Sequence, residues 1–172
     1  MWLIVATGSS VVVAQIRRKV NSPMMISERV RPHAADVVAE AADTVRLARL
    51  PHYLELEAHD LEARLHELLD AVLTSLETER PLHFAEHAYH VASDRFHAGV
   101  RIEEVQTAFN ALEAALWRRI ASVVPTERVV HDLGAVGAVL GAGKDQLASR
   151  YVELAGARHS HGVDVAHLVD AL

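Results

Sequence analysis

The chain contains no cysteine, little proline and glycine, and few aromatic residues. Without cysteine it can form no disulfide, no thiolate nucleophile and no cysteine-ligated metal site. Its 5 prolines and 8 glycines exclude a collagen-like chain or one dominated by linkers. Its 17 Lys and Arg residues are outnumbered by 23 Asp and Glu residues. The chain therefore lacks the basic surface expected of a nucleic-acid-binding protein.

What the chain does contain is typical of one globular and mostly helical domain. It has 172 residues, of which 51% are hydrophobic and 23% are charged. A chain of this length can bury a core without disulfides or structural metals. The 12 histidines are the unusual feature of the composition. Composition thus predicts a soluble domain but does not indicate what the domain does.

Residues 1–26 are predicted to form a leader or arm, poorly ordered or packed against a partner. The apolar stretch at the start is interrupted at residues 8–10, and the basic cluster at residues 17–19 follows it. A secretory signal carries its positive charge before the apolar stretch, and a membrane-spanning helix needs about 20 apolar residues. We therefore expect no membrane segment and a cytoplasmic protein.

From residue 27 onward, the spacing of apolar residues predicts an all-α domain of about five main helices. Ser27 and Asp60 are the expected N-caps, and Gly99 is the expected left-handed C-cap. Residues 158–172 are expected to form a tail or the start of a linker helix. The predicted helices cover residues 27–50, a segment from 51 or 60 to 77, residues 81–98, residues 102–124, and a segment from 126 or 133 to 157.

Two features of the last two predicted helices indicate close contacts. Trp117 lies at the edge of an apolar stripe, where it forms either the rim of the core or a contact for a partner. A glycine inside a helix costs roughly 1 kcal/mol, so Gly134, Gly137 and Gly141 together predict either the close approach of another backbone or a kink. Close packing is the favoured interpretation, because alanines continue the small-residue character. We assign Trp117, Gly137 and Gly141 to a predicted interface.

Residues 84–117 carry a recognisable pattern of a helix, a turn at glycine and a second helix. Its motifs are FAE at 84–86, SDRFHAGV at 93–100, IEEV at 102–105 and ALW at 115–117. With them, roughly residues 30–157 resemble the N-terminal domain family of the RsbT co-antagonist proteins, the sensor domains of bacterial stressosomes. The resemblance implies a globin-like helical fold without haem, a homodimer, and a sensory role in stress signalling through a protein partner. It supplies no catalytic residues.

Histidines are concentrated in the predicted helix 81–98. Steps of three and four residues place five side chains on one face of it: His83, His87, His90, Asp94 and His97. Imidazoles at this spacing can bind zinc, nickel or iron. They can also act together as a pH switch, because histidine titrates near pH 6.5. A solvated polar face is the simpler interpretation, since one helix supplies only two or three metal ligands.

A globin-like fold raises the alternative of a haem-binding sensor, which needs a histidine pointing inward from an apolar wall. His131 is the best candidate ligand and His66 is the second. No enzyme is predicted, because the metalloprotease and serine-hydrolase motifs are absent. Segment 138–145 fails as a phosphate loop at Ala138 and Asp145. We predict a cofactor-free, dimeric regulatory domain, with a haem- or metal-binding sensor as the alternative.

Overall fold

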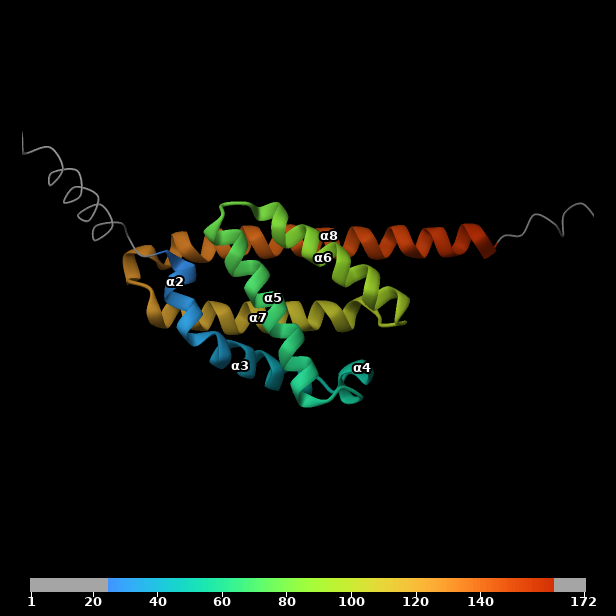
Figure 1. Ribbon diagram of the computed structural model, residues 1–172, viewed down its shortest axis with the longest axis horizontal. Coiled ribbons are helices and arrows are strands. Elements are labelled where there is room, and N and C mark those ends of the chain that lie inside the picture. Colours follow the sequence, from blue (N-terminus) through green and yellow to red (C-terminus); the bar gives the residue numbers. More distant parts are fainter. Residues whose placement is uncertain (1–24, 163–172) are drawn as a thin grey trace, which may run out of the picture.

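The structure is a computed structural model that describes residues 25–162, with side chains described as far as residue 158. The predicted leader up to residue 24 and the predicted tail from residue 163 lie outside this range. Every regular element in the described range is a helix, as the all-α prediction requires (Figure 1). The elements are α2 (Ile26–Val30), the 3-10 helix η1 (Arg31–His33), α3 (Ala34–Leu47), α4 (Pro51–Leu54), α5 (Ala58–Glu77), α6 (Pro81–His97), α7 (Ile102–Val123) and α8 (Thr126–Gly162).

The predicted first helix is divided into α2, η1 and α3. Pro32 has no N–H to continue the helical hydrogen-bond ladder, so a continuous helix across residues 27–50 was wrong. Ser27 is not the cap but lies buried inside α2. The N-cap is Met25, whose own N–H donates to the carboxylate of Glu28 over 3.0 Å.

The predicted second segment is also divided, into α4 and α5. Pro51 takes the first position of α4, where the missing N–H of proline costs nothing. Helix α5 begins after the N-cap Glu57, so Asp60 lies in the first turn and is not the cap. A carboxylate in the first turn still interacts favourably with the positive end of the helix dipole.

The turn between α6 and α7 confirms the left-handed glycine predicted at the end of α6, which follows the C-cap Ala98. Gly99 has a φ of 76°, a conformation that glycine adopts without steric cost. The N–H of Val100 donates to the carbonyl of Arg95 over 2.9 Å, and that of Gly99 to Phe96 over 3.0 Å. These bonds satisfy carbonyls that the end of α6 would otherwise leave unpaired.

Helix α8 is the longest element, with 37 residues. It starts at the earlier of the two predicted positions and continues past the predicted end at residue 157. At 1.5 Å per residue it is roughly 55 Å long. Its C-terminal turns extend beyond the α6–α7 turn (Figure 1).

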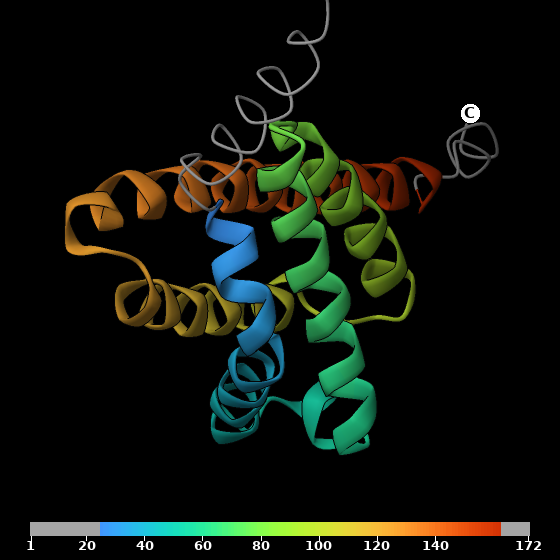
Figure 2. The ribbon, with the colours of Figure 1, turned by 60° about the vertical axis from the view of Figure 1, so that its left-hand side comes forward.

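The helices pack in pairs that cross. Helix α6 lies along α8, and α3 lies along α7. In Figure 2, α7 and α8 run side by side while α5 runs across them. One apolar core joins all these helices, and its largest fully buried side chains include Phe84, Phe109, Leu112, Leu116, Leu140 and Leu147. Each such side chain contributes about 1.5–3 kcal/mol by leaving water.

Close packing against a glycine occurs at a position that sequence reasoning did not single out. A Cβ added to Gly143 on α8 would lie 2.2 Å from Cε1 of Phe84 on α6. At Gly134, Gly137 and Gly141 an added Cβ meets nothing within 4 Å. The predicted close approach at these three glycines was therefore wrong for packing within the described chain, because their side of α8 faces open space.

Candidate functional site

The predicted histidine face of α6 does not converge on one point. His83, Asp94, His90 and His97 are exposed, whereas His87 is half-buried. His83, His87 and His90 border three different hollows of the surface. His97 is held locally, with its Nδ1 2.7 Å from the carbonyl oxygen of Ser93.

Helical spacing alone does not gather metal ligands here. In residues 25–162, no group of three or more His, Asp or Glu side chains is placed to hold a metal ion. Burial lowers the pKa of His87, and the neighbouring His83 and His90 lower it further, while Glu67 opposes them. His87 is therefore a neutral imidazole near neutral pH.

The two candidate haem ligands do not have the geometry that the haem alternative needs. His131 is exposed in the first turns of α8, with its Nδ1 3.0 Å from Oδ1 of Asp132. His66 is exposed on α5. Neither imidazole points inward from an apolar wall, because each occupies the outer face of its helix.

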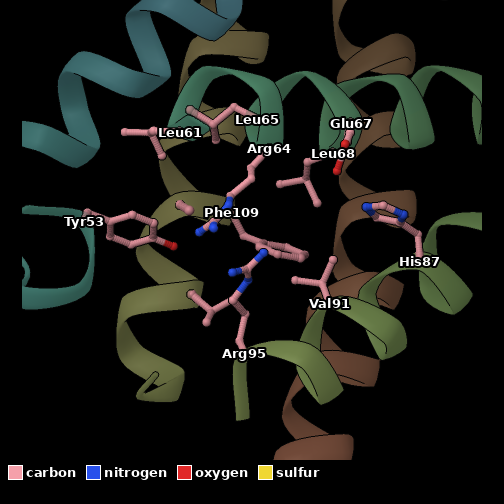
Figure 3. Close-up of a pocket in the computed structure, with 12 residues that line it drawn as sticks. Tyr53, Leu61, Arg64, Leu65, Glu67, Leu68, His87, Val91, Arg95 and Phe109 are labelled. Atoms are coloured by element: carbon pink, nitrogen blue, oxygen red, sulfur yellow. The ribbon is translucent and has the colours of Figure 1, made fainter. Parts of the chain in front are cut away.

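A small cavity lies where α4, α5, α6 and α7 meet (Figure 3). Its volume is about 60 Å³. The apolar part of its lining includes Leu65 and Leu68 from α5, Val91 from α6, and Phe109 from α7. The ring of Phe109 is buried and packs 5.8 Å from that of Phe84, so this wall of the cavity is part of the core.

Two arginines from different helices point into this cavity. Figure 3 shows Arg64 from α5 and Arg95 from α6 with their guanidinium groups facing each other. Burial lowers the pKa of Arg64, and the charge of Arg95 lowers it further. No ion pair or hydrogen bond joins the Arg95 side chain to any residue in the described range. Two positive charges therefore share a partly buried space, and no carboxylate of the described residues forms an ion pair with either of them.

A histidine orients one of the two guanidinium groups. Nη1 of Arg64 lies 3.2 Å from Nε2 of His52. Because a guanidinium only donates hydrogen bonds, this Nε2 must accept and the imidazole must be neutral. Burial and the charges of Arg64 and Arg95 lower the pKa of His52, which favours that neutral form.

Tyr53 supplies a third donor to the same space. Its side chain is 8% exposed and its hydroxyl points toward the two guanidinium groups (Figure 3). Burial raises the pKa of Tyr53 to about 12, so the phenol stays protonated. The hydroxyl makes no hydrogen bond to any residue described by the structure.

A buried carboxylate fixes this end of the cavity. Glu104, 4% exposed at the start of α7, accepts the backbone N–H of His52 over 3.0 Å. Its other oxygen lies 3.5 Å from Nε of Arg101. Glu104 therefore pins α4 to α7 and holds Tyr53 beside the arginines, while its own oxygens are occupied.

Sequence reasoning missed this cavity. Arg95 and Glu104 both lie in the recognised motifs, but spacing along one helix cannot show which charges from separate helices converge. The available signal is an arginine at the boundary of an apolar stripe, as at Arg64 between Leu61 and Leu65. That pattern also describes an ordinary solvated edge, so it does not single out the position.

Of the predicted interface residues, Trp117 lies on α7, whereas Gly137 and Gly141 lie on α8. Trp117 is 42% exposed and Val130 is 83% exposed. Gly137 and Gly141 are half-buried with open space beside them. One turn before Trp117, Glu113 forms an ion pair with Lys144 that joins α7 to α8.

The family comparison bears on the whole domain. The family model for the RsbT co-antagonist protein rsbRD N-terminal domain matches residues 33–161, which is more than half of the chain. No curated protein and no solved structure gives a significant match. Within the described residues, no helix is both long enough and apolar enough to cross a membrane.

Proposed function

The chain belongs to the RsbT co-antagonist protein rsbRD N-terminal domain family, and we propose that it acts as a cofactor-free homodimer that relays a signal to a protein partner. The family is one of stressosome-type regulatory sensor domains rather than of enzymes. The finer proposal includes a globin-like arrangement of the helices and action in the bacterial cytoplasm. Absence of a cofactor is supported by the exposure of His131 and His66, which leaves neither in position to ligate haem.

The exposed surface of α7 and α8 supports the proposed homodimer. Trp117 and Val130 expose apolar area there, and tryptophan is among the residues that most often dominate binding energy at interfaces. Gly137 and Gly141 have no side chains, and the open space beside them on α8 leaves room for a second helix to approach. We place the dimer contact on this surface.

The continuity of α8 supports the proposed relay. It packs along α6 and α7 and then extends past them. The Tyr151 hydroxyl donates to the carbonyl of Val100 over 3.2 Å, tying α8 to the α6–α7 turn. Displacements of one or two ångströms between packed helices are a recognised means of transmitting a signal.

Replacing Trp117 tests the proposal. The wild-type chain should sediment as a dimer at micromolar concentration, and Trp117→Ala should weaken dimerisation at least ten-fold because an anchor residue of the interface is lost. Leu82→Ala, which also removes an exposed apolar side chain but on α6, should leave the dimer unchanged. Haemin added to the wild type should give no saturable Soret band. A monomeric wild type would refute the dimer.

A further inference from the structure

We propose that the cavity between α4, α5, α6 and α7 binds a small carboxylate that carries a short apolar group. The inference deepens the proposed sensory function, on which it rests, by naming a chemical class for the signal. It is carried by three hydrogen-bond donors, Tyr53, Arg64 and Arg95, which meet in one partly buried space. Apart from the contact of Arg64 with His52, no side chain in the described range accepts a hydrogen bond from them.

The donors define the charge of the ligand. Guanidinium groups only donate hydrogen bonds, and Tyr53 stays protonated, so the convergence calls for an anion. A single guanidinium can bind a carboxylate through two parallel N–H···O bonds, and such charge-assisted bonds are stronger than neutral hydrogen bonds. The acids nearby do not fill this role. Glu104 is occupied by His52 and Arg101, and Glu67 is exposed at the His87 end of the cavity (Figure 3).

The remaining lining and the volume define the rest of the ligand. Leu65, Leu68, Val91 and Phe109 form an apolar wall that a bare inorganic anion would leave uncovered. One water-sized sphere takes roughly 10–15 Å³ of such space. A cavity of about 60 Å³ therefore holds roughly four to six non-hydrogen atoms, which is the size of a short-chain carboxylate.

His52 is a positioning residue for this site rather than a contact of the ligand. By accepting from Nη1, it leaves the other N–H groups of Arg64 free to face the cavity. Glu104 in turn holds the backbone of His52. The arrangement keeps the Arg64 guanidinium directed inward without using a counter-charge that would block an anion.

The test is a titration of the full chain with butyrate at constant ionic strength, followed by calorimetry and by nuclear magnetic resonance. Butyrate should bind saturably at one site per chain, and butyramide, which has nearly the same shape without the charge, at least ten-fold more weakly. Arg64→Gln and Arg95→Gln should each weaken butyrate binding at least ten-fold. Tyr53→Phe should weaken it two- to ten-fold.

Arg80→Gln is the matched control, since it removes one positive charge at the opposite end of α6 and should leave binding unchanged. Arg95→Gln should also raise the melting temperature without ligand, because it removes a like-charge contact. This shift distinguishes lost binding from lost folding. The proposal is wrong if butyramide binds as tightly as butyrate, or if chloride competes for the site as strongly as butyrate does. It is also wrong if butyrate shows no saturable binding.

The experiments test the carboxylate site and the proposed dimeric relay independently. If butyrate binds but the wild-type chain is monomeric, the site stands and the dimeric relay is wrong. If butyrate does not bind while Trp117→Ala dissociates a wild-type dimer, the relay stands and the carboxylate site is wrong.

Discussion

The two sides of α6 differ in how they pack. Toward α8, the ring of Phe84 lies so close to Gly143 that no side chain could replace the glycine without displacing the ring. Toward α5, the same helix leaves a cavity into which Arg95 and the half-buried His87 project. One side is therefore tightly packed, and the other encloses a cavity that contains two positive charges. A helix of this kind can respond to a ligand on one face while keeping its register on the other.

Truncating Phe84 should have the largest effect on this difference. Phe84→Ala should lower the free energy of unfolding by about 3–5 kcal/mol, because it opens a void in the tightly packed side. Chemical denaturation would measure the loss. Leu82→Ala, on the same helix but 73% exposed, should change stability by less than about 0.5 kcal/mol. Similar losses of unfolding free energy in both variants would contradict a tightly packed contact between α6 and α8.

A pair of glycine substitutions on α8 should separate the tight contact from the open surface. Gly143→Ala should destabilise the domain by about 1–3 kcal/mol, because its methyl group would overlap the ring of Phe84. Gly134→Ala has open space around it and should stabilise the helix by about 0.5–1 kcal/mol. Thermal unfolding of the two variants checks the sign. Stabilisation by both would show that the ring of Phe84 moves aside freely.

The cavity side should also respond to pH, with a smaller effect. Burial lowers the pKa of His87 in the folded state. Below about pH 6.5, His87 is therefore protonated in the unfolded chain at a pH where it is still neutral in the folded chain. Stability is therefore fully present above that pH and should fall as the pH drops toward the folded-state value. The groups around His87 are Glu67 on α5, which opposes the shift, and His83 and His90 on α6.

Urea unfolding at about pH 7.5 and about pH 5.5 measures this dependence. His87→Gln should reduce the decline but not abolish it, because the pKa of His52 is also lowered by burial and by Arg64 and Arg95. His66→Gln, which replaces an exposed histidine that is not among the groups acting on His87, should keep the wild-type decline. An unchanged decline in His87→Gln would assign the effect to other groups.

Local chemistry predicts the ends of several helices but not their packing. The structure confirms the helix starts at Pro51 and Pro81 and the left-handed turn at Gly99, which follow from the backbone properties of proline and glycine. The break at Pro32 was missed because the apolar spacing continues through it. The caps at Ser27 and Asp60 were wrong because each helix begins one or more residues earlier than its first apolar repeat suggests.

The site depends on how helices face one another, which a single sequence does not contain. The histidine spacing on α6 is real, yet neighbouring helices cover only His87 and leave the others exposed. The glycines of α8 look alike in the sequence, yet of those that the structure describes only Gly143, which faces Phe84, makes a tight contact. Arg64 and Arg95 are 31 positions apart, and only the crossing of α5 and α6 brings them together.

The length of α8 has a geometric consequence. Gly143 lies near its middle and packs tightly against Phe84 of α6, so α8 could tilt about this position. The helix continues for roughly 28 Å from there to its last described turn. A tilt of about 10° at Gly143 would swing that end through about 5 Å, a distance comparable to one helical turn. A tilt too small to disturb the core would therefore still displace the C-terminal turns of α8 by several ångströms.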